Sequence, residues 1–555
     1  MKTPREWQAS LTLPQGDTFG SDMEYRTTDA ETRTFFNTAT LAADYKLAQA
    51  YSSVRILEYR GEGDLAVETF EDYIAPRADA LAQRFDAKEH PRPKYPKDED
   101  YLDTRSRRHH PHGEVLVIID EAVYGNISKS VDQYVLDIGR EGYWATIHTV
   151  SGGGPAYIRS YINKHPCVGV LLVGAVPAPW FELSNDFHGA TTSFPCDLYY
   201  MDTNATWSDL DGNGKFNSVT GHVDPEIWVG RLWTPTAGGI DAALLTDYFR
   251  RNHLFREGKM GHARSALAYV DDDWTGFNDC ALDQQFPSSV ITTYTNPDTT
   301  DADLYKAEVN SLRSWVQLCA HSWTQGHALY VPSAGKSEYI QSAYFRDTNP
   351  PNAHFYNLFC CGPGRYTSAD YLAGWYVFDK PGGGTNHGLA AVASAKSGSM
   401  LFFEDFYRQL GRGTDIGTAY LRWWQARGPS HDLNEQRWFY GLVLLGDPTL
   451  TWWKGNVPGL EQPEREDVFD HWPRKMQFRW DPVNLPNVNY HLQVDYDTGS
   501  WAEETGRSCY NYYNITSNTF DFSFVGMQRG RWRVRAAVDD RYCRWSPWSY
   551  FRFTV

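Results

Sequence analysis

Two short segments of the chain carry the residue types that covalent catalysis by a cysteine requires. His321 ends the apolar run VQLCAH, and Cys361 ends the apolar run NLFCC 40 residues later. Short apolar runs of this kind are typical of buried strands in a parallel sheet. Reactive groups in such sheets lie just beyond the carboxyl ends of the strands. A thiol and an imidazole brought there by neighbouring strands would form a nucleophile and its acid–base partner.

The Cys361 thiol has a rival in Cys360. Neighbouring residues of a strand point to opposite faces, so only one of the two can face a cleft. Cys361 is followed by Gly-Pro-Gly, and we expect the Gly362 N–H to point at an oxyanion. The alternative is that both cysteines are small buried core residues, which is the usual place of a free cysteine.

His327 competes with His321 within the segment HSWTQGH. Two histidines six residues apart match neither one face of a helix nor the short ligand spacings of zinc sites. The spacing therefore favours an acid–base role for His321 over a zinc site.

The segment DLDGNGKFN carries the strongest metal-binding pattern in the chain. Its oxygen-bearing side chains occupy positions 1, 3, 5 and 9 of an EF-hand-type loop, with Gly214 at the sharp turn of position 6. The predicted calcium ligands are Asp209, Asp211, Asn213, Lys215 and Asn217. Position 12 is Thr220 rather than glutamate, so a bidentate carboxylate must come from elsewhere. The candidates are Asp202, Asp224 and Glu226. The alternative is an Asx-rich turn that binds no ion.

These residues belong to a block of alternating strands and helices that runs from 114 to 455. The other expected strands lie at 114–120, 168–176, 226–232, 265–271, 388–395 and 439–446. Strands separated by helical segments predict an α/β domain, with a mostly parallel sheet flanked by helices. In such a domain the strand ends bring His321 and Cys361 to one edge of the sheet.

The segments on either side of this block have a different character. Residues 1–113 are predicted to be a helical accessory segment and linker, with helices at 27–53 and 63–85. This segment is interpreted either as an arm on the main domain or as an inhibitory prosegment. Residues 456–470 are predicted as a linker. Residues 471–555 alternate apolar and polar residues between turn signals, which predicts a small antiparallel β-sandwich.

The bulk composition argues against several classes of protein. The net charge is −17, whereas phosphate binding by a nucleic-acid binder needs a basic face. No apolar stretch is long enough for a membrane span. Eight cysteines in 555 residues do not make a disulfide scaffold, and pairing of Cys509 with Cys543 stays open. The N-terminus lacks the apolar core of a secretory signal, which predicts a cytoplasmic protein, or a secreted one if the N-terminus was processed or replaced.

The middle block resembles the gingipain-type cysteine peptidases of the caspase-like clan. The resemblance extends over most of 114–455 and includes, in order, LLVGAVPAPWFE, EIWVGRL, the His321 and Cys361 segments, KSGSM and LLGDPTL. The last domain is similar to fibronectin type III domains in FRWDPV, RWRVRA and SPWS. These resemblances imply a caspase-like sheet flanked by helices, followed by an immunoglobulin-like sandwich.

The resemblance also implies roles for single residues. Cys361 would be the nucleophile, supported by Tyr366 five residues after it, and His321 would protonate the leaving amine. In the segment YVDDDWTGFND, Asp272 would orient His321, and Asp279 would lie in a specificity pocket for Arg or Lys. The alternative for this segment is a solvated or cation-binding acidic loop.

Two positions depart from the family pattern. Ser322 stands where a glycine usually follows the histidine, and Cys360 stands where a small residue usually precedes the nucleophile. The resemblance and the residues together predict a cysteine endopeptidase with a structural Ca²⁺ ion, no organic cofactor, a polypeptide substrate and a protein partner for the last domain. The alternatives are a catalytically inactive binding or scaffold protein, which these two departures favour, and a calcium-dependent adhesin.

Overall fold

The computed structural model describes residues 112–554 and three short strands before them, β1 (Met23–Tyr25), β2 (Leu57–Tyr59) and β3 (Lys88–Glu89). Within 112–554 the description has gaps at 222–223, 262, 380–386, 428–430, 453–457, 459, 464–466, 484–487, 500, 502–508, 539–540, 543–544 and 547. The helices predicted at 27–53 and 63–85 lie outside the described residues, and so does Cys543.

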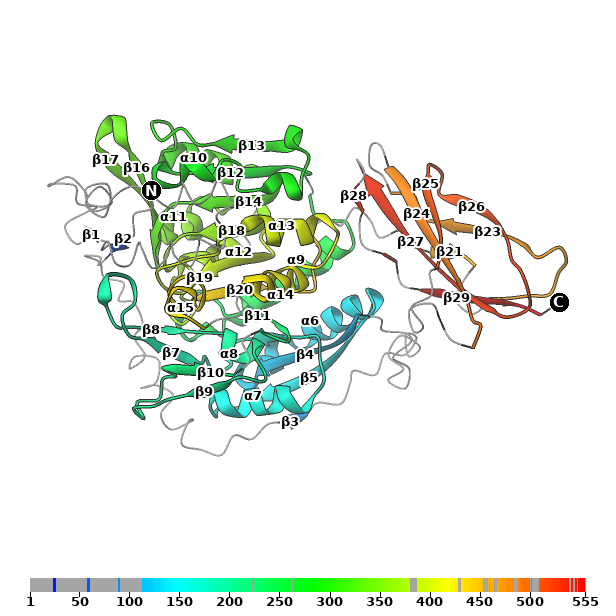
Figure 1. Ribbon diagram of the computed structural model, residues 1–555, viewed down its shortest axis with the longest axis horizontal. Helices are drawn as coiled ribbons and strands as arrows, with labels where there is room; N and C mark the ends of the chain where they lie inside the picture. The colour runs from blue at the N-terminus through cyan, green and yellow to red at the C-terminus, as the bar shows by residue number, and fades with distance from the viewer. Residues whose placement is uncertain are drawn as a thin grey trace.

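The centre of the molecule is one eleven-stranded, mostly parallel sheet (Figure 1). In sheet order its strands are β13 (Ile291–Tyr294), β12 (Ala266–Val270), β14 (Arg313–Cys319), β18 (Ala353–Phe359), β19 (Ala390–Ser394), β20 (Leu442–Gly446), β11 (Trp228–Leu232), β6 (Gly169–Val173), β4 (Gly113–Asp120), β5 (Tyr143–Val150) and β3. The pairs β19–β20 and β3–β5 are antiparallel. Most of its strands are continuous apolar runs buried on both faces, which confirms the predicted α/β class.

Helices cover both faces of this sheet, as labelled in Figure 1. The α6 face is covered by α6 (Glu121–Arg140), α9 (Ala242–Arg256), α10 (Ala302–Val309), α11 (Ser342–Asp347) and α12 (Leu372–Val377). The α14 face is covered by α7 (Pro155–Lys164), α8 (Leu198–Met201), α13 (Phe403–Gly411), α14 (Ile416–Arg427) and α15 (Leu433–Phe439). Helix α6 is representative, because its buried apolar residues recur every three or four positions from Val123 to Ile138. Asp120 caps its first turn by accepting the Ala122 N–H at 2.9 Å.

Three small antiparallel sheets lie beside the main one. They are β7 (Trp180–Leu183) with β8 (Thr192–Pro195), β9 (Thr206–Ser208) with β10 (Ser218–Thr220), and β15 (His321–Trp323) with β16 (Gly326–Val331) and β17 (Lys336–Gln341). None of them was predicted, because strands this short carry little periodic signal. The third sheet matters for the site, since β15 begins at His321.

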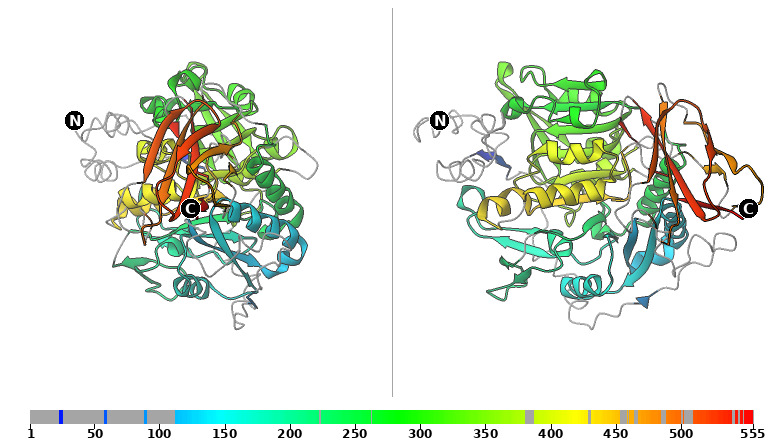
Figure 2. Two further views of the ribbon diagram at one scale, coloured as in Figure 1. Left: turned by 90° about the vertical axis from the view of Figure 1, so that its right-hand side faces the viewer. Right: turned by 45° about the vertical axis from the view of Figure 1, so that its right-hand side comes forward.

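The C-terminal residues form two further sheets, drawn in orange and red in Figures 1 and 2. One consists of β21 (Leu460–Gln462), β23 (Lys475–Trp480) and β26 (Thr519–Ser523). The other consists of β22 (Asp467–Phe469), β29 (Ser549–Phe553), β27 (Arg529–Val538), β24 (Val488–Tyr496) and β25 (Tyr510–Ile515), with β28 (Arg541–Tyr542) paired to β27. The two sheets meet where the rings of Phe478 and Trp532 lie 4.7 Å apart between centroids. The linker predicted at 456–470 is wrong in part, because β21 and β22 lie within it and pair with later strands.

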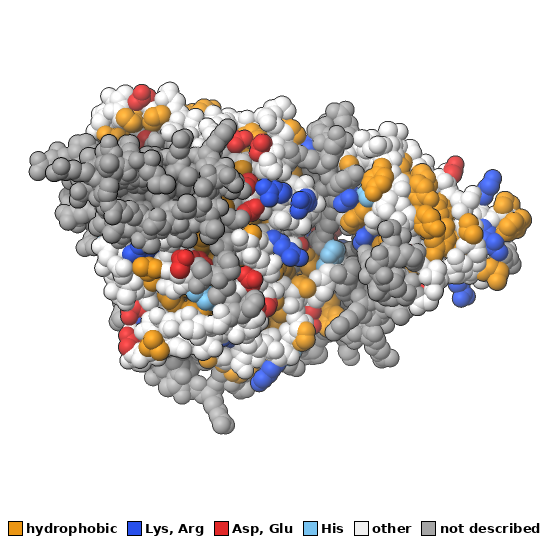
Figure 3. Space-filling view, in the orientation of Figure 1, with side chains coloured by type: hydrophobic (Ala, Val, Ile, Leu, Met, Phe, Trp, Pro, Cys, Tyr) orange, Lys and Arg blue, Asp and Glu red, His pale blue; other side chains and the backbone are white. Residues whose placement is uncertain are grey.

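The surface of the C-terminal sheets is unusually apolar for this molecule. Figure 3 shows apolar side chains gathered there. The exposed large apolar residues of this part are Val468, Trp472, Tyr510, Tyr513, Val525 and Met527. Among the described residues, no helix has both the length and the apolar character to cross a bilayer.

Candidate active site

The register between β14 and β18 brings His321 and Cys361 to one edge of the sheet. Cys319 is paired with Phe359, and the Ala320 N–H donates to the Phe359 carbonyl at 3.2 Å. His321 and Cys361 each stand two residues beyond this paired position. Since neighbouring strands lie about 4.8 Å apart, the two residues follow adjacent strand ends, as the sequence predicted.

The two adjacent cysteines belong to opposite faces. Phe359 lies in the core of the α14 face, whereas Cys360 is buried in the core of the α6 face. Burial raises the pKa of the Cys360 thiol well above its usual range, which keeps that thiol protonated. Cys361 is only half-buried, and Lys396, with which it interacts, lies over the Phe187 and Phe194 rings of the α14-face core. Cys361 is therefore the more accessible thiol, on the side of the α14 face.

His321 is held by a carboxylate and an aromatic ring on that same side. Its Nε2 lies 2.9 Å from Oδ2 of Asp273, and both side chains are buried. The Trp274 ring, part of the α14-face core, lies 4.4 Å from the imidazole between centroids. Asp273 and Trp274 belong to the 3₁₀ helix η7 (Asp272–Phe277), which follows β12 after one residue. The end of a third strand thus fixes the orientation of the imidazole.

The residue that orients His321 is Asp273 and not Asp272, which corrects the sequence prediction by one position. Asp272 lies close by, with a carboxylate oxygen within 4.8 Å of the ligand atoms of both others. Asp271 is fully buried and accepts the Tyr330 N–H at 3.1 Å, and burial raises its pKa. Successive side chains of a 3₁₀ helix point about 120° apart, so the turn decides which of three aspartates meets the histidine.

A buried lysine lies two residues after the end of the next strand in the sheet, the same offset that His321 and Cys361 have from their strands. Strand β19 lies beside β18, and Lys396 comes two residues after it. Its Nζ lies 3.0 Å from a carboxylate oxygen of Asp186 and donates to two backbone carbonyls at 2.6 Å. Lys396 also interacts electrostatically with Cys361, and burial lowers the pKa of the ammonium while Asp186 opposes that change. The sequence prediction missed this residue, although its offset from a buried strand equals that of His321.

The N–H of Gly362 is engaged within the turn that carries Cys361. It donates to the Lys396 carbonyl at 2.9 Å, and Gly362 has a φ of +81°, which favours glycine. The prediction that this N–H faces an oxyanion is therefore wrong for this structure. The hydrogen bond instead ties the Cys361 turn to the segment after β19.

Asp279, predicted for a specificity pocket, lies shortly after η7 and is half-buried. Its carboxylate accepts a backbone N–H at 3.1 Å, and burial raises its pKa. The neighbouring apolar residues reach the ends of β18 and β14. The Phe277 and Phe359 rings lie 5.4 Å apart between centroids, and the Cys280 and Cys319 sulfur atoms lie 3.5 Å apart. The segment therefore borders this edge of the sheet mainly through apolar side chains.

The predicted calcium loop connects β9 to β10 and is folded around the Asp209 carboxylate. This carboxylate accepts the N–H groups of Gly212, Asn213 and Gly214 at 2.8, 3.2 and 2.8 Å. The Asp211 carboxylate accepts from Asn213 Nδ2 at 3.1 Å. The loop thus brings together two carboxylates and an amide, whose oxygens are ligands that Ca²⁺ can use.

Glu182 of β7 supplies the further carboxylate that the loop sequence lacks. It accepts from Asn213 Nδ2 at 3.2 Å and from Lys215 Nζ at 3.0 Å. The Lys215 side chain is thus paired, which leaves only its backbone carbonyl as a cation ligand. Of the carboxylates suggested by the sequence, Asp202 and Glu226 instead accept hydrogen bonds from residues 203–205. The donor set of carboxylate and amide oxygens fits a hard cation such as Ca²⁺.

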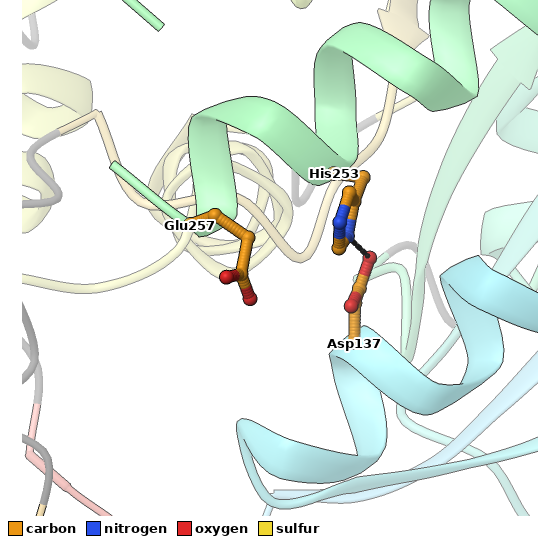
Figure 4. A group of neighbouring side chains, drawn as sticks. All are labelled: Asp137, His253 and Glu257. Atoms are coloured by element: carbon orange, nitrogen blue, oxygen red, sulfur yellow. Dashed lines mark hydrogen bonds and ion pairs between the residues drawn. The ribbon is translucent and has the colours of Figure 1, made fainter. Parts of the chain in front are cut away.

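A second group of potential metal ligands lies at the ends of α6 and α9. Asp137, His253 and Glu257 bring ligand atoms within 4.8 Å of one another (Figure 4). His253 Nδ1 lies 2.8 Å from Asp137, and the Arg140 guanidinium lies 3.8 and 3.9 Å from the two carboxylates. Arg140 already supplies the positive charge that a metal ion would bring, so this group is an ion-pair cluster.

Comparison with solved structures gives two distant matches to most of the chain and one to a short part of it. The crystal structure of the Arg-specific cysteine proteinase gingipain R is 12% identical, with a TM-score of 0.47, and the match covers 82% of this chain and 100% of that chain. A complex of the Porphyromonas gingivalis RgpB pro- and mature domains is 11% identical, with a TM-score of 0.46, and the match covers 80% of this chain and 100% of that chain. An Fn3-like protein from Clostridium thermocellum is 18% identical, with a TM-score of 0.13, and the match covers 18% of this chain and 92% of that chain.

No family model and no curated protein matches the chain by sequence. The description of the fold and site therefore rests on the strand order, the register and the side-chain contacts given above.

Proposed function

We propose that this protein is a cysteine endopeptidase, with Cys361 as nucleophile and His321 as acid–base residue. The observation that carries the proposal is the placement of these residues at the ends of two paired strands, together with the 2.9 Å contact between His321 and Asp273. A histidine oriented by a carboxylate, beside an accessible thiol, is the arrangement that activated cysteine nucleophiles use. We also propose the finer architecture, a caspase-like domain followed by a fibronectin type III-like sandwich.

In the proposed reaction, Nδ1 of His321 transfers the protons, because Nε2 faces Asp273. The Cys361 thiol gives its proton to Nδ1, and the sulfur bonds to the scissile carbonyl carbon. The resulting imidazolium then protonates the leaving amine as the C–N bond breaks and a thioester forms. Water attacks the thioester, its proton passes through His321, and the thiol is restored with a carboxylic acid as product.

The buried Lys396 supports the thiolate form in this scheme. A positive charge near a cysteine lowers the pKa of its thiol, and Lys396 interacts electrostatically with Cys361. Asp186 compensates most of the charge, because its carboxylate pairs with the ammonium at 3.0 Å. We therefore assign Lys396 a modest activating role.

Cleavage after Arg or Lys would require the Asp279 carboxylate to face the substrate. A half-buried carboxylate on the segment that borders the catalytic edge supports this preference. The Asp279→Asn variant tests it, because loss of the carboxylate should remove the preference for basic side chains and leave cleavage of other peptides intact.

We propose that a Ca²⁺ ion binds the loop at 209–217. Asp209, Asp211, Asn213, Asn217 and the Lys215 carbonyl would be its ligands, with Glu182 as the added carboxylate. An ion there would stabilise the loop between β9 and β10 and would take no part in the chemistry.

The apolar side chains exposed on the C-terminal sheets support a role of that domain in binding a protein partner.

A peptide-library digest tests the proposed activity. Wild-type protein is expected to cleave peptides, and the Cys361→Ala variant is expected to lose this activity while keeping the wild-type melting temperature. The His321→Ala variant is expected to lose the activity as well, with a lower melting temperature because Asp273 loses its buried partner. Labelling by an alkylating probe should occur at Cys361, and Cys360 serves as an internal control because it is buried. A folded wild-type protein that cleaves no peptide would instead favour the binding or scaffold protein.

A further inference from the structure

A buried hydrogen-bonded chain begins directly beside His321, on the other face of the sheet. Ser322 is the cross-strand partner of His327 in the β15–β16 hairpin. Side chains alternate along a strand, so Ser322 points away from the side of His321, toward the α6 face. Its hydroxyl lies 2.6 Å from Nδ1 of His327, and both side chains are at most 5% exposed. Nothing in the proposed reaction uses these residues.

The chain continues from His327 through two tyrosines. Nε2 of His327 lies 2.8 Å from the Tyr376 hydroxyl on α12, and this hydroxyl lies 2.8 Å from that of Tyr305 on α10. Both tyrosines are fully buried. Burial lowers the pKa of His327 to about 3, so its imidazole is neutral and donates with only one nitrogen.

The directions of these hydrogen bonds follow from counting protons. The Ser322 hydroxyl donates its single hydrogen to the His321 carbonyl at 2.7 Å, so Nδ1 of His327 must donate to the Ser322 oxygen. Nε2 of His327 is then the acceptor for Tyr376, and Tyr376 is the acceptor for Tyr305. Each link has one donor and one acceptor, and the chain needs no buried charge.

The Ser322 hydroxyl is the point at which this chain meets His321. A hydroxyl has one hydrogen to donate and can accept two hydrogen bonds. The Ser322 hydroxyl donates to the His321 carbonyl and accepts from His327, which joins the backbone of His321 to the buried chain. A glycine at 322 would leave His327 and the His321 carbonyl without this partner.

We propose that Ser322, His327, Tyr376 and Tyr305 are positioning residues, which fix the placement of His321 relative to Cys361 through the backbone of His321. The inference rests on the proposed function, because it assigns these residues to that same reaction. The backbone of His321 is anchored through its carbonyl, which accepts the Ser322 hydroxyl. Small errors in placing reacting groups cost large factors in rate, so loss of the chain lowers kcat more than it raises KM.

The test compares variants that remove single hydroxyl groups. Ser322→Ala and Tyr376→Phe should each lower kcat about 10- to 100-fold with KM within about twofold, and Ser322→Thr should restore most of the loss. Tyr356→Phe is the matched control, because Tyr356 is buried on the same face and its hydroxyl accepts only the Ala353 N–H in the described contacts. The Ser322→Ala and Tyr376→Phe effects should be less than additive when combined, because both residues bond to His327.

A second measurement separates this inference from the proposed function. The rate of Cys361 alkylation by iodoacetamide is followed against pH, with the folded fraction checked by thermal unfolding. Ser322→Ala and Tyr376→Phe should move the midpoint of this profile, and Tyr356→Phe should not. If the wild type cleaves no peptide but the midpoints still move, the proposed function fails and the positioning role stands. If Tyr376→Phe behaves as Tyr356→Phe in both assays, the positioning role is wrong.

Discussion

His321 and Asp273 are joined by a buried contact of 2.9 Å between Nε2 and Oδ2. The carboxylate holds the ring so that its other nitrogen is left for the substrate, and it stabilises the imidazolium that forms during proton transfer. We therefore expect Asp273→Asn to lower kcat/KM about 100-fold.

The neighbouring carboxylate is the control for this change. Asp272→Asn should lower kcat/KM less than about tenfold, since Nε2 of His321 contacts the Asp273 carboxylate. Both variants are assayed on one fluorogenic peptide chosen from the library. A larger loss of kcat/KM for Asp272→Asn than for Asp273→Asn would mean that Asp272, as predicted from the sequence, orients His321.

The buried ion pair between Lys396 and Asp186 should contribute strongly to the free energy of unfolding. Removing one partner leaves a buried charge without compensation, so Lys396→Met or Asp186→Leu alone should lower the free energy of unfolding by about 3–5 kcal/mol. The double variant should lose much less than the sum of the two. Urea unfolding measures these differences. The exposed Lys259, 3.5 Å from Glu257, is the control, and Lys259→Ala should change stability by less than about 1 kcal/mol. If the double variant at Lys396 and Asp186 lost as much stability as the two single variants together, the pairing of these two residues would be contradicted.

At acidic pH, the proton that His327 binds more readily in the unfolded state should destabilise the fold. Burial lowers the pKa of this histidine to about 3, so between about pH 6.5 and 3 the unfolded state binds one more proton than the folded state. Its contribution to stability is complete above pH 6.5 and is lost as the pH falls. We expect the unfolding free energy of His327→Gln to depend less steeply on pH than that of the wild type, by about 1.4 kcal/mol per pH unit.

His491 is a second histidine with a lowered pKa, to about 4, with burial as the main cause. His491→Gln should reduce the same slope above about pH 4 and leave it unchanged between about pH 4 and 3, which separates the two contributions. Unfolding in urea between pH 3 and 8 measures both variants. An unchanged slope in His327→Gln would mean that this imidazole is protonated inside the fold.

The loop at 209–217 should make stability depend on calcium. An ion that binds only the folded state at about 100 times its Kd adds about 2.7 kcal/mol, so Ca²⁺ should raise the melting temperature of the chelator-treated protein. Asp209→Asn should abolish this increase. Asp303→Asn should keep it, because Asp303 is 89% exposed and pairs only with Lys306 in the described contacts. Equal melting temperatures of the wild type in Ca²⁺ and in chelator would contradict calcium binding by this loop.

The sequence predicted those parts of the site that lie at strand ends and missed those that depend on turns. Apolar runs mark β14 and β18, so local pattern predicted that His321 and Cys361 follow strand ends. The preference for Cys361 over Cys360 also depended on the family resemblance. The choice of Asp273 depends on the rotation of η7, which no periodicity records. Glu182 reaches the loop at 209–217 across a hairpin too short to be predicted. The contact of Ser322 with His327 is also invisible in the chain, because it depends on the pairing of β15 with β16.

The strands β21 and β22 have a practical consequence for dissecting the molecule. β21 extends one C-terminal sheet beside β23, and β22 extends the other beside β29. A fragment cut at residue 471, where composition suggests a boundary, would expose the backbone of two edge strands and invite aggregation. A recombinant fragment for finding the binding partner should therefore begin before Leu460.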